Sequence, residues 1–232
     1  LSRYDVIYLG KKAEELGFVR DTLEKVTRLA DVLEYLNTNP ILKESLALKG
    51  GTAINLTIFN LPRLSVDIDM DYLVNNSREE MLNQRELINS TINRYMISQG
   101  YTKNEKTKKP HSLDSWVYDY IGASGNRDNI KIEINYSLRA HMLQAEERPI
   151  VTEHFGGGHK VKTLAPIEIY GSKINALLSR AAASGTSTAA TRAAAAAAVA
   201  AAVSCCCSRL HNVQRPLCHA AGHGQGRGQQ SP

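Results

Sequence analysis

The sequence predicts an α/β protein in which a small mixed sheet has flanking helices and a helical C-terminal part. Leu46 to Leu48 form a short apolar segment, typical of a buried strand, that leads through two glycines into a predicted helix. Residues 66 to 71 alternate apolar and acidic side chains, as a strand with one packed face does. Apolar residues recur at helical spacing over residues 78–99 and 166–178. Strands and helices therefore alternate along the chain.

Two helices are predicted before the first strand, over residues 9–16 and 21–36. The second carries Leu23 and Leu33 on one side, and Asn39-Pro40 is predicted to end it. We expect both helices to cover one side of the sheet and to keep their charged faces in solvent.

The glycine turn is the first candidate functional feature. Gly50, Gly51 and Thr52 follow the first strand, and residues 52–59 are predicted to be helical. Glycines let the backbone approach a phosphate without a Cβ in the way, and the N–H groups that open a helix point at an anion. The turn therefore predicts a phosphate-binding corner.

Three aspartates follow at alternate positions. Asp67, Asp69 and Asp71 share one face of the predicted strand, about 7 Å apart, where like charges repel unless a cation lies among them. Mg²⁺ is the natural candidate because it takes carboxylate and phosphate oxygens together. A calcium loop is excluded, since Tyr72 and Arg78 stand where such a loop needs Gly and Glu. A solvated polar strand face remains an alternative, although it does not explain the adjoining glycine turn.

Later segments supply further candidates. After the helix at 78–99, strands are predicted at 115–121 and 130–137, and Glu133 falls on the polar face of the latter. Glu133 is a candidate third metal ligand, with a salt bridge to Lys131 as the alternative. Pro166 favours the start of the last helix, in which Lys173 lies at the margin of the apolar stripe.

Other motifs are weaker. A basic loop is suited to an RNA backbone or simply to solvent, and its lysines are Lys103, Lys106, Lys108 and Lys109. Arg139 has the planar fork that suits a phosphate, and His141 is interpreted as an ordinary histidine. Gly156 to Gly158 lack the Lys-Ser/Thr of a phosphate-binding P-loop and predict a hairpin turn.

Four segments together resemble the AbiEii/AbiGii toxin family of bacterial type IV toxin–antitoxin and phage-abortive systems, which has the nucleotidyltransferase fold. They read KGGTAINL, RLSVDIDMDYL, KIEINYSLRAH and the helix from Pro166 to Leu178. The resemblance covers Tyr4 to Arg180. A single Gly-Gly or Asp-x-Asp occurs in many protein families, whereas the order of these segments and the Arg-x-Ser-x-Asp-x-Asp motif are specific to this family.

The resemblance implies Mg²⁺-dependent transfer of a nucleoside monophosphate from an NTP to an acceptor, with pyrophosphate leaving. The acceptor it implies is RNA, plausibly tRNA, and the partner is a cognate antitoxin that acts mainly at the gene level. Asp67 and Asp69 would hold two Mg²⁺ ions, and Lys173 would hold the triphosphate. The nucleotide-binding positions implied are Gly50, Gly51, Thr52, Arg63 and Ser65.

The charge is distributed unevenly. Of the formal net charge of +5, the four arginines after Arg180 supply four, and no acidic residue follows them. The cysteines, Cys205 to Cys207 and Cys218, also lie in this tail, so the main domain needs no oxidising compartment. No signal peptide or membrane-spanning run is evident, which predicts a cytoplasmic protein. Leu1 in place of Met indicates a fragment or a non-standard start codon.

The predicted organisation is a nucleotidyltransferase-like domain over residues 1–180 and a low-complexity tail over 181–232. Within the domain we expect N-terminal helices at 1–40, the catalytic sheet at 41–165 and a C-terminal helix at 166–180. The tail lacks the Arg-Asp-x-x-Asp-like segment that the resemblance implies. Its alanine-rich composition suggests a frameshift near residue 183, and a genuine, largely disordered tail is the alternative. Three adjacent cysteines cannot all bind one zinc ion without strain.

Two alternative functions remain open from the sequence. A catalytically inactive remnant would bind nucleotide or a partner only, and the missing aspartate segment is its support. An enzyme that modifies a protein or an antibiotic hydroxyl would use the same nucleotide donor chemistry.

Overall fold

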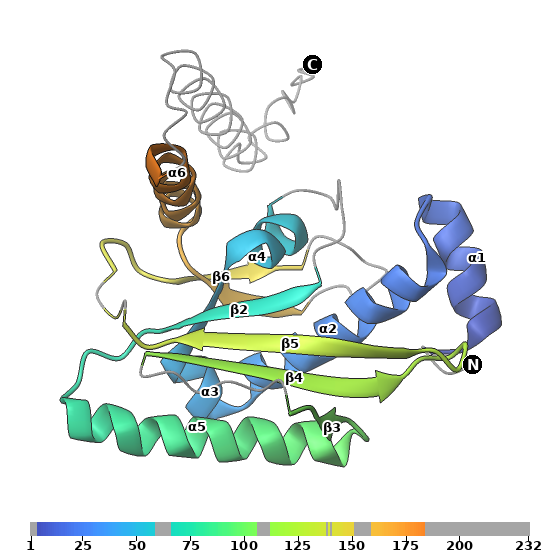
Figure 1. Cartoon of the computed structure of the whole chain (residues 1–232), viewed down its shortest axis with the longest axis horizontal. Coiled ribbons are helices and arrows are strands. Elements are labelled where there is room, and N and C mark those ends of the chain that lie inside the picture. Colours follow the sequence, from blue (N-terminus) through green and yellow to red (C-terminus); the bar gives the residue numbers. More distant parts are fainter. Residues whose placement is uncertain are drawn as a thin grey trace, which may run out of the picture. The chain divides into compact units, whose positions relative to one another are not determined.

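The computed structural model describes residues 4–58, 66–105, 112–137, 139, 141–150 and 159–183, with side chains up to residue 180. Its centre is a mixed sheet with the strand order β3-β4-β5-β2-β1-β7-β6 (Figure 1). The pairs β2/β5 and β1/β7 are parallel, and the other neighbouring pairs are antiparallel. The strands are β1 (Leu46–Lys49), β2 (Asp67–Tyr72), β3 (Thr102–Lys103), β4 (Leu113–Ile121), β5 (Arg127–Asn135), β6 (Glu146–Pro149) and β7 (Lys160–Thr163).

The chain divides into two compact units, Leu1–Lys173 and Ile174–Pro232, and the whole sheet belongs to the first. No helix in the described part of the chain combines the length and apolar character needed to cross a membrane. The helices are α1 (Val6–Leu16), α2 (Arg20–Thr38), α3 (Pro40–Ser45), α4 (Gly50–Thr57), α5 (Arg78–Ser98) and α6 (Pro166–Ala183).

One face of the sheet packs into the core. The apolar positions of β2 and β5 are at most 2% exposed, and they are Ile68, Met70, Ile130, Ile132 and Ile134. Helices α2 and α5 contribute to the same core, and they contact each other through the stacked rings of Tyr35 and Tyr95, 3.7 Å apart. The alternating residues of β2 and β5 are thereby left on the other face. The predicted alternation in β2 is confirmed.

The predicted role of Asn39-Pro40 is only half right. These residues end α2, but they also begin α3, in which Pro40 is the first residue and the Asn39 side chain accepts a hydrogen bond from Leu42 N at 3.3 Å. Proline is favoured at the first position of a helix because its missing N–H has no partner there anyway. A signal to stop one helix is here also a signal to start the next.

Two strands at the far edge were not predicted. β6 and β7 pair in antiparallel fashion, with Pro149 opposite Lys160, and β7 lies parallel to β1. The glycines at 156–158, for which the sequence predicts a hairpin turn, lie between these strands and outside the described residues. Smaller shifts affect the bounds of other elements: α1 begins at Val6, α4 at Gly50 and β4 at Leu113, and β5 spans Arg127–Asn135.

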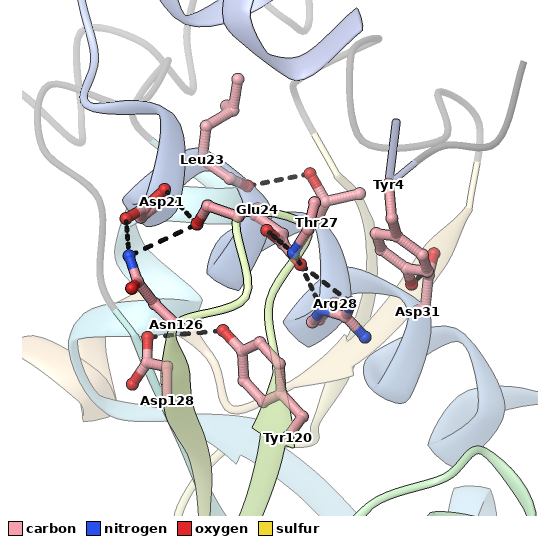
Figure 2. A network of polar contacts seen from close by, with 12 residues as sticks. Tyr4, Asp21, Leu23, Glu24, Thr27, Arg28, Asp31, Tyr120, Asn126 and Asp128 are labelled. Atoms are coloured by element: carbon pink, nitrogen blue, oxygen red, sulfur yellow. Dashed lines mark hydrogen bonds and ion pairs between the residues drawn. The ribbon is translucent and has the colours of Figure 1, made fainter. Parts of the chain in front are cut away.

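A buried carboxylate joins α2 to the turn between β4 and β5 (Figure 2). Both oxygens of Glu24 accept from Ala123 N, at 3.0 and 2.9 Å, and Oε1 also accepts from Arg28 Nε at 2.9 Å. Glu24 is 3% exposed, whereas the nearby contact of Asp21 with Asn126 lies at the surface. Glu24 therefore satisfies a backbone donor that the turn itself leaves unpaired.

We expect Glu24→Gln to lower the free energy of unfolding by about 2 kcal/mol, because hydrogen bonds to a charged group are stronger than neutral ones. Urea unfolding would measure the loss. Asp21→Asn is the matched control on the same helix and turn, and its exposed contacts should contribute much less. Equal losses in the two variants would contradict the inference that the hydrogen bonds of Glu24 hold the β4/β5 turn against α2.

Candidate active site

The glycine corner and the aspartates meet directly. β1 ends at Lys49 and α4 begins at Gly50, whose φ is +75°. A Cβ placed on Gly50 would lie 2.5 Å from Asp69 Oδ2, closer than unbonded atoms can approach. Gly50 is therefore required twice, by its backbone conformation and by the carboxylate that packs against it.

Gly50→Ala should displace the Asp69 carboxylate and also strain the backbone by about 1 kcal/mol. We expect at least a tenfold loss of nucleotide transfer, because a small misplacement of a catalytic group is enough for such a loss. Gly17→Ala is the matched control, since Gly17 has φ +71° but nothing within 4 Å of its would-be Cβ. It should lose similar stability and no activity; equal activity in both variants would argue against a catalytic role for the corner.

A row of polar side chains crosses four neighbouring strands. Lys49 in β1 lies opposite Asp69 in β2, which lies opposite Glu133 in β5, which in turn lies opposite Ser115 in β4. Because residues in register across a sheet share a face, these side chains line one face next to the glycine corner. We call this set the carboxylate row, and Asp67 stands beside it on the same face of β2.

The charge around Asp69 is unfavourable. Burial raises the pKa of the Asp69 carboxyl, and the negative charges of Glu133 and Asp67 raise it further. Lys49 and Lys173 lower the pKa but do not cancel the rise. The folded protein therefore keeps a carboxylate where negative charge is in excess.

Glu133 has a different environment. Burial acts to raise the pKa of its carboxyl, but hydrogen bonds from Lys131 and Ser115 and the positive charges of Lys131 and Lys49 together leave the pKa lowered. Lys131 Nζ lies 2.8 Å from Glu133 Oε1, and Ser115 Oγ donates to the same oxygen at 2.9 Å. The salt bridge considered from the sequence is thus present, although it runs along β5 rather than across strands. Glu133 as a third metal ligand stays a prediction.

Asp67 and Asp69 suit a divalent metal ion. Their carboxylate oxygens are hard ligands of the kind Mg²⁺ takes, and a cation would relieve the repulsion around Asp69. Within the described residues, no three His, Cys, Asp or Glu side chains form a group that could hold a metal ion.

Thr52 has a contact that the sequence did not predict. Its side chain is fully buried, and its hydroxyl donates a hydrogen bond to the carbonyl oxygen of Asp67. The hydroxyl thus ties the first turn of α4 to the start of β2. A phosphate contact by Gly50, Gly51 and Thr52 stays a prediction, and for Thr52 it concerns the backbone N–H.

Lys173 lies in α6, and its side chain is exposed. Its charge acts on the Asp69 carboxyl, where it lowers the pKa, so the sequence-predicted lysine and aspartate belong to one electrostatic environment. The segment before α6 is anchored to the sheet, since Leu164 N donates to Leu48 O at 3.0 Å. Glu168 in the first turn of α6 accepts from Leu143 N at 3.1 Å and so joins α6 to the segment that contains Leu143.

Not every candidate from the sequence lies in the described region. Arg63 and Ser65, predicted to bind the nucleotide, fall outside the described residues, as do three of the four lysines of the basic loop. Arg139 is described, and its guanidinium donates to Asn76 O at 2.9 Å, which gives it a structural contact.

One functional-site pair was missed from the sequence. Lys49 forms an ion pair with Asp71, the third aspartate of the alternating set, which is 1% exposed. The only sign of this pair in the sequence is the lysine directly before the glycines. Which acidic residue it pairs with depends on the β1/β2 register, in which Asp71 lies opposite Ala47.

The mixed sheet, the glycine corner and the acidic strand beside it define a nucleotidyltransferase-type α/β protein. Residues 31–189 match the family described as nucleotidyl transferase AbiEii toxin, type IV TA system. The chain belongs to this family, and the family and fold class predicted from the sequence are confirmed. No curated relative matches the chain.

The chain is similar to two solved structures, of which the first supports the fold. MenT4, a nucleotidyltransferase toxin from Mycobacterium tuberculosis H37Rv, is 20% identical with a TM-score of 0.51, over 76% of this chain and 59% of that one. JHP933 from Helicobacter pylori is 18% identical with a TM-score of 0.40, over 65% of this chain and 54% of that one. The chain thus spans less than two thirds of either protein.

Proposed function

We propose that this chain transfers a nucleoside monophosphate from an NTP to an acceptor hydroxyl, with release of pyrophosphate. The observation that carries the proposal is the close approach of Asp69 to Gly50, which puts a carboxylate next to the glycine turn that opens α4. Family membership supports the class of reaction. A solvated strand face would not need a glycine at this position.

The reaction forms a bond between the acceptor oxygen and the α-phosphorus and breaks the bond between that phosphorus and the leaving pyrophosphate; the hydroxyl proton passes to water. Asp67 and Asp69 would hold Mg²⁺, which when bound supplies positive charge to the reacting phosphoryl oxygens and to the acceptor oxygen. The backbone N–H groups that open α4 at Gly50 and Gly51 would bind phosphate oxygens.

The remaining residues position the nucleotide. Lys173 would neutralise the triphosphate and the leaving pyrophosphate, and its effect on Asp69 supports this place in the site. Arg63 and Ser65 keep their sequence-based assignment to nucleotide binding. Thr52 would hold β2 at the corner through the Asp67 carbonyl.

RNA, in particular tRNA, is the acceptor we propose, on the strength of the family resemblance. The same resemblance suggests a cognate antitoxin that controls the toxin mainly at the gene level, and a cytoplasmic location. The sequence of the upstream gene would test the antitoxin, because a small winged-helix protein is expected there.

The test is a transfer assay with each radiolabelled NTP, total tRNA and Mg²⁺, run on the full chain and on Asp67→Ala. We expect label in the tRNA fraction that requires Mg²⁺ and disappears in the variant. Label in a protein or a small molecule would instead identify a different acceptor for the same donor chemistry. No labelling by either protein, with the fold intact by circular dichroism, would favour the inactive remnant.

A further inference from the structure

The ion pair between Lys49 and Asp71 lies within the polar face that carries the candidate metal ligands. Lys49 is opposite Asp69 in the β1/β2 register, and Asp71 is two residues further along the same strand. Side chains two apart on a strand share a face, so Asp71 would otherwise be a third acidic group for the same cation. Its side chain is 2% exposed and that of Lys49 is 27% exposed.

Burial makes this pair asymmetric. A carboxylate as buried as Asp71 needs a partner, whereas the Lys49 ammonium is partly in solvent and has other acidic groups nearby. Lys49 therefore serves two neighbours at once: it neutralises Asp71, and it keeps one positive charge opposite Asp69. Among the described residues, Asp71 is the ion-pair partner of Lys49.

We propose that Lys49 is a positioning residue and the built-in counter-ion of the carboxylate row. The ion pair keeps Asp71 out of metal coordination and holds the ammonium beside Asp69. There the positive charge weakens the binding of a divalent cation by repulsion but does not occupy the cation's place. This inference rests on the proposed function, because it assumes that Asp67 and Asp69 take a divalent ion. It assigns two members of the alternating aspartates to the metal and the third to the lysine.

Substitutions of the two partners of this ion pair should then change the affinity for a divalent metal ion in opposite directions. Lys49→Met removes the positive charge, so the dissociation constant for Mn²⁺ should tighten roughly tenfold. Asp71→Asn frees the ammonium to pair with Asp69, so Mn²⁺ must displace it and should bind roughly tenfold more weakly. The double variant has the wild-type net charge and should bind Mn²⁺ within about threefold of wild type.

Isothermal titration of the full chain with Mn²⁺ alone, without nucleotide or acceptor, measures these constants directly. Arg85→Met is the matched control. It also leaves a buried aspartate, Asp114, without its partner, but on the core face of the sheet. It should lower the melting temperature and leave the Mn²⁺ constant unchanged, which separates general destabilisation from an effect at the site.

Wild-type affinity in both single variants, or a change in the same direction in both, would overturn the inference while leaving the proposed metal site intact. No Mn²⁺ binding by wild type would overturn the metal site and this inference together. Should Lys49→Met fail to fold, the double variant decides: binding as weak as in Asp71→Asn contradicts the counter-ion role, and recovery toward wild type supports it.

Discussion

Asp69→Asn is expected to abolish nucleotide transfer and at the same time to raise the melting temperature at neutral pH. A metal-bound carboxylate contributes several kcal/mol to the transition state, which corresponds to a loss of about 10³-fold or more. The stability effect has the opposite sign because burial and the charges of Glu133 and Asp67 disfavour the ionised side chain in the folded protein.

The pH dependence follows from the raised pKa of Asp69. In the unfolded chain this carboxyl ionises near its ordinary pKa of about 3.9, whereas in the folded protein it holds its proton to a higher pH. Between the two pKa values the folded state binds more protons, so the contribution of Asp69 to stability falls as pH rises and stays unfavourable above the folded pKa. The advantage of Asp69→Asn should therefore be larger at pH 7.5 than at pH 4.

Thermal unfolding in the presence of a chelator, at both pH values, measures this difference without bound metal. Glu133→Gln is the matched control from the same row. Hydrogen bonds from Lys131 and Ser115, together with the charges of Lys131 and Lys49, lower the pKa of Glu133 in spite of burial, so loss of its charge should destabilise the protein at pH 7.5. Unfavourable effects of both substitutions, or transfer activity retained by Asp69→Asn, would refute the assignment of Asp69.

The strand of alternating aspartates could be predicted from the sequence because its information is local. Alternation alone puts Ile68 and Met70 in the core and Asp67 and Asp69 on the other face. The glycine turn is also predicted from neighbouring residues alone, since two consecutive glycines directly after a buried strand favour a tight turn at that position. The close approach of Asp69 to Gly50 is a tertiary contact, however, and the only sequence signal for it was the order of the two motifs along the chain.

The partners of individual polar atoms could not be predicted in the same way. The Thr52 hydroxyl is buried and donates to the Asp67 carbonyl oxygen, and nothing in the local sequence fixes this burial or this partner. Lys49 and Asp71 lie in different strands, and a shift of register by one residue would separate them.

The short strands β6 and β7 at the sheet edge could not be predicted from the sequence for a related reason. β6 has the sequence Glu-Glu-Arg-Pro and no apolar residue, and β7 has one apolar residue among its four. Periodicity needs a longer run than this to be visible. These strands form because β7 has β1 as a parallel neighbour and β6 has β7, so their backbone groups are paired from outside the segment.

Asp114→Asn is expected to produce a large loss of stability, about 3–5 kcal/mol, because it removes the negative charge that the buried Arg85 guanidinium pairs with. Arg85 Nη2 lies 2.7 Å from Asp114 Oδ1, and Nε donates to Oδ2 at 3.0 Å. Asp114 is fully buried, and the Arg85 guanidinium also lies 4.9 Å from the centre of the Tyr136 ring. This pair joins α5 to β4 on the face opposite the candidate active site.

Desolvation makes the result of removing both partners different from that of removing one. A double substitution, Arg85→Met with Asp114→Leu, eliminates both buried charges, so its loss in urea unfolding should be smaller than that of Asp114→Asn alone. Glu147→Gln, which breaks the exposed ion pair with Lys43, should leave the unfolding midpoint unchanged. Losses that simply add in the double variant would mean that the two side chains stabilise the protein independently, and the ion pair would then not account for the attachment of α5 to the sheet.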